Sequence, residues 1–296
     1  MDKKKLHIDQ TPSTNTWLMT HCREEDYPNL FTVYTFRQTA GRGQAGNAWE
    51  SEPGKNLSFS TLVHIHTIEE ASRLNMLVPL AVVNVLSKVK GQRSTAQQIV
   101  RSAVQERKVE SQGSRGEGRE AKDEDGFTIK WPNDIYWGDK KVAGLLNENV
   151  IIGNRIAYAV AGIGVNVNQE VFRSDAPNPV SLKQITGETY ELEPMIDAIV
   201  AEMERLLPLL QDYEALKREY MAHLYRKTGF HLYVEREVST APTSIASTKE
   251  VKGQRSKVKG SFLAEIADID DFGRLVLRSE TGELKTYHFK EIRFVI

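Results

Sequence analysis

The glycine-rich loop at residues 41–46 constrains this chain more than any other feature. Its sequence, GRGQAG, follows a strand-like segment and matches the G-x-G-x-x-G pattern of dinucleotide-binding domains. In those domains the loop opens a helix whose N-terminus binds the pyrophosphate. Here it continues into NAWESEPGKN, where Pro53 and Gly54 break any helix before the next strand. The missing helix argues against an NAD- or flavin-dependent oxidoreductase. Arg42 instead suits the loop to an anion, and a plain hairpin turn is the alternative.

Hydrophobic periodicity predicts an α+β domain in the first three quarters of the chain. Ser13 precedes Trp17 and Leu18 and predicts an N-capped helix. Further helices are expected at 69–89, where Pro79 must kink the helix or lie near its start, and at 192–225. Strands are expected at 31–36, 57–66, 127–131, 134–137, 141–146 and 155–168.

The remaining sequence predicts a second domain and two insertions. From about Gly229 onward, short strands alternate with Gly and Asp turns, which is typical of a small all-β barrel. We therefore expect domains at 1–228 and 229–296. Residues 91–126 are polar and charged and predict an inserted flexible loop, and a second insertion is expected at about 240–259. The hexapeptide VKGQRS occurs in or beside both, at 89–94 and 251–256.

Composition excludes several classes of protein. The formal net charge of −1 lacks the basic excess of a nucleic-acid-binding protein. No apolar run approaches the roughly 20 residues of a membrane span, and the first residues do not resemble a secretory signal. Cys22 is the only cysteine, so no disulfide can form within the chain. We expect a soluble, cytoplasmic protein that binds neither nucleic acid nor membranes.

A second group of polar residues follows the strand at 127–131. The sequence Lys130-Trp131-Pro132-Asn133-Asp134 is followed by Lys141 on the next strand but one. A lysine on a strand projects from a rigid support, and Gly144 leaves room for a ligand at the backbone. A third segment, GIGVNVN at 162–168, ends in two amides; a buried strand with a turn is its alternative interpretation.

Five motifs occur in a fixed order: STN at 13–15, Gln38 followed by AGRGQAG and Trp49, KWPND at 130–134, KVAG at 141–144, and GIGVNVN. Together they resemble the biotin protein ligases over about residues 8–225, without 91–126. The resemblance implies a mixed β-sheet flanked by helices, as in class II aminoacyl-tRNA synthetases and biotin ligases, followed by a small SH3-like barrel. STN begins so early that we expect no amino-terminal DNA-binding domain.

The resemblance also implies a reaction. Such enzymes use ATP and Mg²⁺ to convert biotin to biotinyl-5′-AMP, and then biotinylate one lysine of a carboxylase carrier domain. Arg42, Lys130 and Lys141 are the implied catalytic cations, which hold the carboxylate and phosphates together. Asp134 is implied either as a Mg²⁺ ligand or as a structural residue. The biotin site is implied to comprise Ser13, Thr14, Asn15, Gln38, Gly41, Arg42, Gln44, Lys141 and Gly144, and the nucleotide site Arg42, Gly43, Trp49, Lys130, Asn133 and Asn166.

One departure and several alternatives accompany this interpretation. The family often has arginines where this chain has Gln44 and Ala45, which predicts weaker retention of the adenylate. Residues 169–183 are expected to form part of a lid over this reactive intermediate. A lipoate or octanoate ligase or transferase is the nearest alternative function, and a non-catalytic biotin-sensing regulator is another. A homodimer is possible on the same resemblance.

Overall fold

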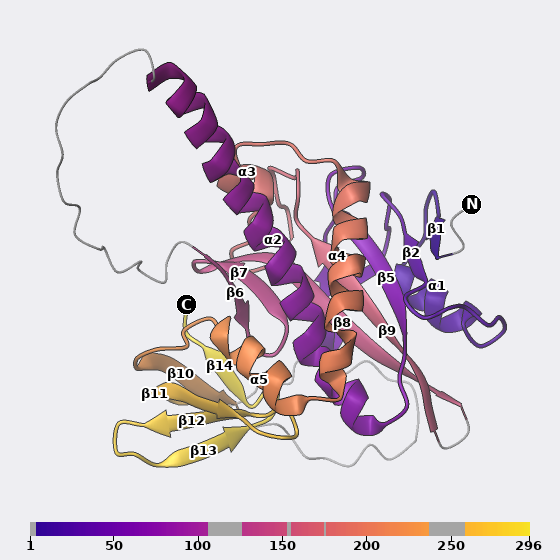
Figure 1. Ribbon diagram of the computed structural model, residues 1–296. Coiled ribbons are helices and arrows are strands. Elements are labelled where there is room, and N and C mark those ends of the chain that lie inside the picture. Colours follow the sequence, from indigo (N-terminus) through magenta and orange to yellow (C-terminus); the bar gives the residue numbers. More distant parts are fainter. Residues whose placement is uncertain (1–3, 106–125, 153–154, 175, 237–257) are drawn as a thin grey trace. The chain divides into compact units, whose positions relative to one another are not determined.

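The computed structural model describes residues 4–105, 126–152, 155–174, 176–236 and 258–296 (Figure 1). The chain separates into two compact units, Met1–His223 and Leu224–Ile296. The sequence analysis predicted the boundary between the two domains after residue 228, which is five residues later. None of the described helices has an apolar stretch of the length needed to cross a lipid bilayer.

The first unit is built on a seven-stranded mixed sheet. Its strands have the order β1-β2-β5-β9-β8-β7-β6, and only β1 and β2 run parallel to each other. The six strands expected from the sequence are all present, together with β1, which was not predicted. Their bounds are β1 Lys5–His7, β2 Thr32–Tyr34, β5 Leu57–His64, β6 Phe127–Lys130, β7 Asp134–Trp137, β8 Lys140–Ile152 and β9 Arg155–Val165.

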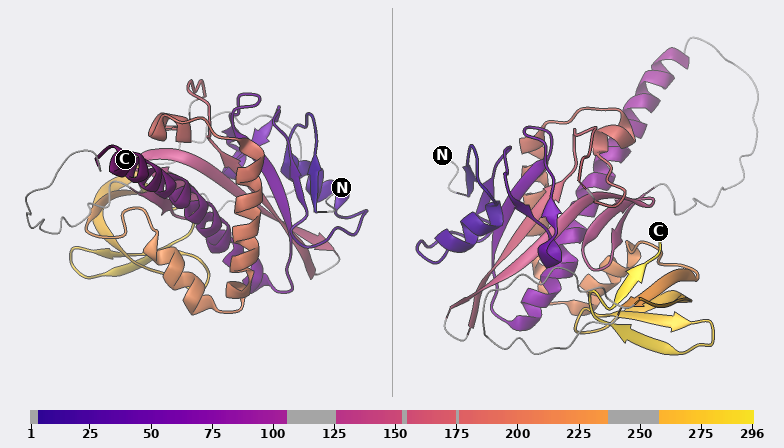
Figure 2. Two further views of the ribbon diagram at one scale, coloured as in Figure 1. Left: turned by 45° about the horizontal axis from the view of Figure 1, so that its top comes forward. Right: turned by 180° about the vertical axis from the view of Figure 1, so that it is seen from behind.

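Helices cover one face of this sheet. The long helix α2 (Ile68–Gln105) lies beside α4 (Leu192–Leu206), and α5 (Tyr213–Ala222) follows a 3₁₀ turn, η3 (Leu207–Leu210) (Figures 1 and 2). Asn147 of β8 donates a hydrogen bond to Asn75 of α2, which identifies the odd-numbered residues of β8 as the face toward this helix layer. The short helix α3 (Leu182–Thr186) begins at a capping box formed by Ser181 and Gln184.

Helix α2 corrects one prediction. Residues 91–105, expected to begin a flexible loop, continue the helix to Gln105. The stretch after Gly91 contains neither proline nor glycine, and extending an existing helix needs no new nucleus, so polar composition alone did not predict its end. The helix also continues through Pro79. The rest of the expected loop, 106–125, lies outside the described residues.

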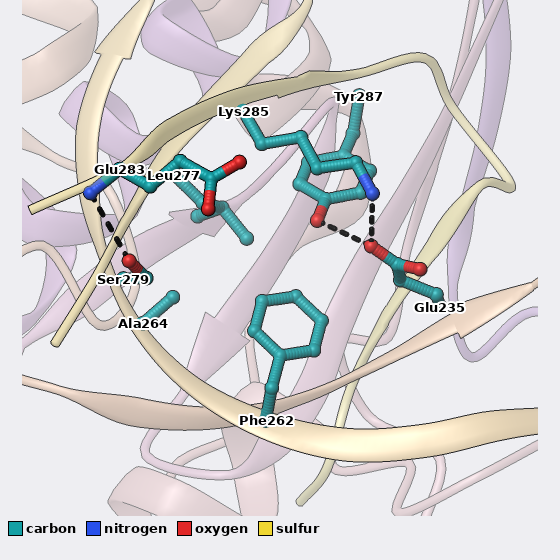
Figure 3. A pocket seen from close by; sticks show the side chains of 8 residues that line it. All are labelled: Glu235, Phe262, Ala264, Leu277, Ser279, Glu283, Lys285 and Tyr287. Carbon is teal, nitrogen blue, oxygen red and sulfur yellow. Dashed lines mark hydrogen bonds and ion pairs between the residues drawn. The ribbon is translucent and has the colours of Figure 1, made fainter. Parts of the chain in front are cut away.

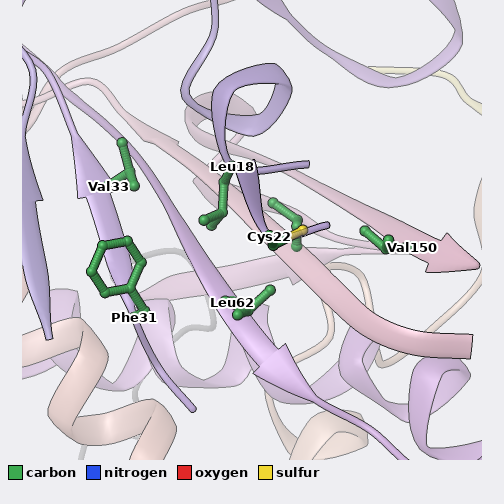
Figure 4. Close-up of a cluster of buried hydrophobic side chains, with 7 residues drawn as sticks. Leu18, Cys22, Phe31, Val33, Leu62 and Val150 are labelled. Carbon is green, nitrogen blue, oxygen red and sulfur yellow. The ribbon is translucent and has the colours of Figure 1, made fainter. Parts of the chain in front are cut away.

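The opposite face of the sheet carries helix α1 (Thr14–His21). Ser13 is its N-cap, as predicted, and accepts a hydrogen bond from the Thr16 backbone N–H at 3.4 Å. The helix buries Leu18 and Cys22 against Leu62 and neighbouring strand residues (Figure 4). Because this face is also covered, β5 is buried on both sides. Strand β5 therefore positions polar residues such as Ser58 and Ser60 inside the unit.

The second unit contains five antiparallel strands. They are β10 His231–Arg236, β11 Val258–Ile269, β12 Leu275–Ser279, β13 Leu284–Tyr287 and β14 Ile292–Phe294, in the order β13-β12-β11-β10-β14. This sheet fits a small SH3-like domain. Within the described strands, β13 and β14 are edges that do not pair with each other, so the expected barrel is not closed. The predicted insertion at 240–259 falls outside the described residues, except for 258 and 259, which belong to β11.

Candidate active site

On the α1 face of the central strands, Gly144 and Gly164 lack a β-carbon, and we call this place the glycine gap. Gly144 of β8 pairs directly with Gly164 of β9, which in turn pairs with Ser58 of β5. A β-carbon at Gly164 would lie 2.5 Å from Cε2 of Trp49, and one at Gly144 would lie 2.9 Å from its Cζ3. Alanine is too large at these positions, so the glycines let the indole of Trp49 approach the sheet backbone. The sequence analysis predicted that a ligand would approach the backbone at Gly144.

Two polar atoms in this gap lack partners. The indole Nε1 of Trp49 and the hydroxyl of Ser58 are buried, and neither has a hydrogen-bond partner among the described residues. Buried polar groups in native proteins are nearly always paired with protein, water or ligand. The glycine gap, which the Trp49 indole covers, therefore has unused hydrogen-bonding capacity.

The loop that carries Trp49 is a hairpin. Strands β3 (Gly41–Arg42) and β4 (Ala48–Trp49) pair antiparallel around the short 3₁₀ helix η1 (Gln44–Gly46). Gly46 has a φ of 84°, a conformation that favours glycine, and the Gly43 N–H donates to the Asn47 carbonyl at 2.7 Å. No dinucleotide-binding helix follows, as predicted. The hairpin places Trp49 over the glycine gap and Arg42 beside Glu148.

The residues predicted to hold the ring of biotin form one connected cluster. The Thr14 backbone N–H donates to Oε1 of Gln38 at 3.0 Å, and the Ser60 hydroxyl lies 2.7 Å from Oγ1 of Thr14. Ser60 also donates to Oδ1 of Asn15 at 2.5 Å. Asn15 lies directly over Gly162, where a β-carbon would collide with its amide. Neutral donors and acceptors are thus gathered at the N-terminus of α1.

A carboxylate that the sequence analysis did not identify, Glu148, connects Arg42 to this cluster. Its Nη2 donates to Oε2 of Glu148 at 2.7 Å, and Nδ2 of Asn15 donates to the same oxygen at 2.9 Å. Glu148 lies on β8 and shares a face with Gly144, four residues earlier. The structure therefore brings Arg42 and the predicted biotin residues together.

Lys141 forms a second ion pair at the other end of the glycine gap. Its Nζ lies 2.7 Å from Oδ1 of Asp134 and 5.9 Å from the centre of the Trp49 ring. A bulge between β7 and β8 occurs at this point. The Lys141 backbone is fixed by residues of the expected lid, since its N–H donates to the Asn178 carbonyl and its carbonyl accepts from Val180.

The other predicted nucleotide residues lie around Lys141. Lys130 pairs with Asp134 in the register of β6 and β7, and its Nζ donates to Oη of Tyr136 at 3.1 Å. Asn133 is buried, and its amide donates to the Leu145 carbonyl at 2.9 Å. Asn166 is also buried, with Nδ2 3.5 Å from the Lys141 carbonyl. These amides stabilise the strand that presents Lys141.

Arg42 and Lys141, two of the three predicted catalytic cations, are held by different carboxylates. Arg42 is bound to Glu148, whereas Lys141 is bound to Asp134 and its Cε would lie 3.3 Å from a β-carbon at Gly144. Gly144 and Glu148 lie four residues apart on β8, which is roughly 13 Å along the strand.

Asp134 and Asn133 already have protein partners. The carboxylate of Asp134 is paired with Lys141, and the amide nitrogen of Asn133 donates to a backbone carbonyl. No three His, Cys, Asp or Glu side chains in the described part of the chain are grouped so as to hold a metal ion. Asp134 as a Mg²⁺ ligand stays a prediction.

Glu50 ties the hairpin to the expected lid. Its carboxylate accepts hydrogen bonds from the backbone N–H groups of Arg173 and Ser174, at 3.0 and 2.7 Å, and from Nε2 of Gln169 at 3.0 Å. Burial raises the pKa of this carboxyl, but the hydrogen bonds outweigh it, so the pKa lies below its ordinary value. The segment after β9 is thereby connected to the residue next to Trp49.

The second unit has a hollow of its own. It has a volume of about 200 Å³ and is lined by Phe262, Leu277 and Tyr287, among other residues (Figure 3). At one side, Glu235 accepts hydrogen bonds from Lys285 and from the Tyr287 hydroxyl. None of the predicted site residues lines this hollow.

The structure combines a mixed sheet, covered by helices on both faces, with predicted site residues around Gly144 and Gly164. Residues 7–166, more than half of the chain, match the model of the biotin/lipoate A/B protein ligase family, and the chain belongs to that family.

Individual relatives agree with this assignment. The bifunctional ligase/repressor BirA of Bacillus spizizenii is 26% identical over 266 residues, which cover 88% of this chain and 65% of that protein. The human biotin--protein ligase is 25% identical over 97% of this chain and 34% of its own length. This chain thus spans less than two thirds of these relatives. The biotin protein ligase of Aquifex aeolicus, solved with biotin and ATP, has the same fold, with a TM-score of 0.65 at 19% identity, covering 99% of this chain and all of that one.

Proposed function

We propose that the chain is an ATP-dependent biotin protein ligase. One observation carries the proposal: the glycine gap under Trp49 runs between a neutral polar cluster with Arg42 at one end and Lys141 at the other. The ureido ring of biotin is neutral and polar, and its side chain ends in a carboxylate. Its two ends therefore match the cluster around Asn15 and a cationic site, respectively. The human relative named as a biotin--protein ligase and the biotin protein ligase of Aquifex aeolicus, solved with biotin and ATP, support this choice of substrate.

The first step joins two anions. A carboxylate oxygen of biotin attacks the α-phosphorus of ATP, the bond to the bridging oxygen breaks, and pyrophosphate leaves. Repulsion between these anions dominates the barrier, so cations held in place before the reaction lower it. We assign Lys141 and Arg42 to the carboxylate and α-phosphate, and Lys130 to the other phosphates. Mg²⁺ arrives with ATP, as part of that substrate.

The adenine and ribose are assigned to the end of the gap nearest Lys141. Trp49 offers an aromatic face there, and its Nε1 is a free donor within the described residues. Asn133 and Asn166 support the strand beneath, with Asn166 as the group assigned to the adenine. Gly43 and Gln44 contribute backbone and amide contacts from the hairpin.

The second step transfers the acyl group. The amine of an acceptor lysine attacks the acyl carbon of the adenylate, AMP leaves, and an amide forms. We propose a biotin carrier domain of a carboxylase as the acceptor, because a relative in Paracoccus denitrificans is named biotin--[acetyl-CoA-carboxylase] ligase. The adenylate reacts with water, so the segment at 169–183 is assigned a protective role, helped by its attachment to Glu50.

Transfer of the acid to a carrier domain tests the proposed function. The full chain is incubated with ATP, Mg²⁺, a purified carrier domain and either biotin or lipoate, and the carrier is analysed by intact mass. We expect a mass increase equal to biotin minus water, at the acceptor lysine. An increase with lipoate alone would assign the chain to the lipoate branch of the same family, and no increase with either acid would reject a ligase.

A further inference from the structure

Glu148 occupies an unexpected position for a site that binds anions. Its carboxylate lies on β8 beside Arg42, a cation assigned to the reacting carboxylate and α-phosphate, and an unpaired negative charge there would repel the substrate. The charge is paired, however, because Oε2 accepts from Nη2 of Arg42 at 2.7 Å. The same oxygen accepts from Asn15 at 2.9 Å. A single atom thus joins the glycine hairpin to the start of helix α1.

The hydrogen bonds continue from Asn15 back to the hairpin. The Ser60 hydroxyl has one proton, and Oδ1 of Asn15 can only accept, so that proton goes to Asn15. The Ser60 hydroxyl also lies 2.7 Å from Oγ1 of Thr14, and the Thr14 backbone N–H donates to Gln38. Gln38 and Arg42 lie on either side of Gly41. The chain of contacts therefore forms a ring that closes through the hairpin backbone.

We propose that Glu148 is a positioning residue for the ligase reaction: it fixes the guanidinium of Arg42 and connects it to the biotin pocket through Asn15. Guanidinium has N–H groups on three nitrogens, so the contact at Nη2 leaves others to face an anion. Fixing the group in advance removes the entropy that a mobile arginine loses on binding the transition state. The inference rests on the proposed function, because Arg42 must act on the substrate.

The test is a double-mutant cycle on adenylate formation. The rate is measured as the release of pyrophosphate when the full chain is incubated with ATP, Mg²⁺ and biotin. Glu148→Gln keeps an oxygen for Asn15 but removes the charge that holds Arg42. We expect it to lower kcat/KM about tenfold with Arg42 present, and less than twofold in an Arg42→Ala background. Equal factors in both backgrounds would show that Glu148 does not act through Arg42 and would overturn the proposal.

A matched control is available in the second unit. Glu265 pairs with Arg278 at 2.9 Å, with side chains 26% and 48% exposed, against 23% and 45% for Glu148 and Arg42. Glu265→Gln should leave adenylate formation unchanged. All variants should melt within a few degrees of the parent chain, which separates positioning from loss of fold.

A second measurement does not depend on activity. Hydrogen exchange at the backbone amides of 41–47 should speed up about tenfold in Glu148→Gln and not in Glu265→Gln. In the Arg42→Ala background, Glu148→Gln should add nothing further. A parent chain that releases no pyrophosphate would reject the proposed function, whereas unchanged exchange in Glu148→Gln would reject this inference by itself.

Discussion

The ammonium nitrogen of Lys141 lies 2.7 Å from Oδ1 of Asp134, so the lysine assigned to the substrate carboxylate is held by a carboxylate of its own sheet. Both side chains are partly exposed, and such pairs contribute only about 0–1 kcal/mol. A bound phosphate or carboxylate can therefore replace Asp134 at little cost. The pair holds Lys141 over Gly144 without locking it there.

Lys141→Ala should slow adenylate formation by a factor of about 10²–10³, the usual loss when one preorganised donor is removed. The fold should persist, because the pair adds little stability. Pyrophosphate release in single-turnover experiments measures the step. Lys140→Ala is the matched control, since Lys140 is the exposed neighbour on the same strand. A near-normal rate for Lys141→Ala would remove this residue from the mechanism.

Gly164→Ala should displace Trp49 from the sheet. The new β-carbon would lie 2.5 Å from Cε2 and 2.6 Å from Nε1 of the indole, and overpacking of this kind costs roughly 1–3 kcal/mol. We expect ATP affinity to fall about tenfold, with a change in tryptophan fluorescence, because the indole can no longer line the gap. Gly260→Ala meets nothing within 4 Å and is the control. Unchanged ATP affinity would argue against a role for the gap.

Glu202 should make the helix layer sensitive to acid. Its buried carboxylate receives hydrogen bonds from Arg205 on α4, and from Asn84 and Lys88 on α2. The bond to Arg205, opposed by burial, and those from Asn84 and Lys88 lower the pKa of Glu202 from 4.5 to about 2.

A lowered pKa means that the folded state favours the ionised carboxyl. The resulting stability is present above about pH 4.5 and is lost as the pH falls toward 2. At pH 7, Glu202→Gln should lower the free energy of unfolding by about 1–3 kcal/mol, and the difference should shrink near pH 3. Chemical denaturation at both values measures this, with exposed Glu204→Gln as control. A difference that does not depend on pH would mean that the charge of Glu202 is not what matters.

Local sequence rules predicted much of this fold because they describe local causes. Ser13 caps α1, the strands follow their periodicity, and Pro53 and Gly54 prevent a dinucleotide-binding helix after the loop. The predicted end of α2 was wrong, because a polar segment can prolong a helix that apolar residues have already started. Barrel closure depends on pairing between distant strands, which periodicity does not encode.

The candidate site shows the same division. Motifs identified Arg42, Lys141 and the asparagines, but not Glu148, whose partner Arg42 lies 106 residues away in sequence. The one available signal was that Glu148 follows Gly144 by an even number of residues on one strand, and so shares its face. Gly162 and Gly164 show the same spacing. Their contacts with Asn15 and Trp49 arise only from the strand register.

The most direct measurement of the central claim is pyrophosphate release from ATP by the purified full chain with biotin or lipoate as the only acid. If the cluster around Asn15 binds the ureido ring while Lys141 and Arg42 act on the reacting carboxylate and α-phosphate, biotin should give one equivalent of pyrophosphate rapidly, and lipoate should give little. Release with lipoate alone, or with neither acid, would contradict the account.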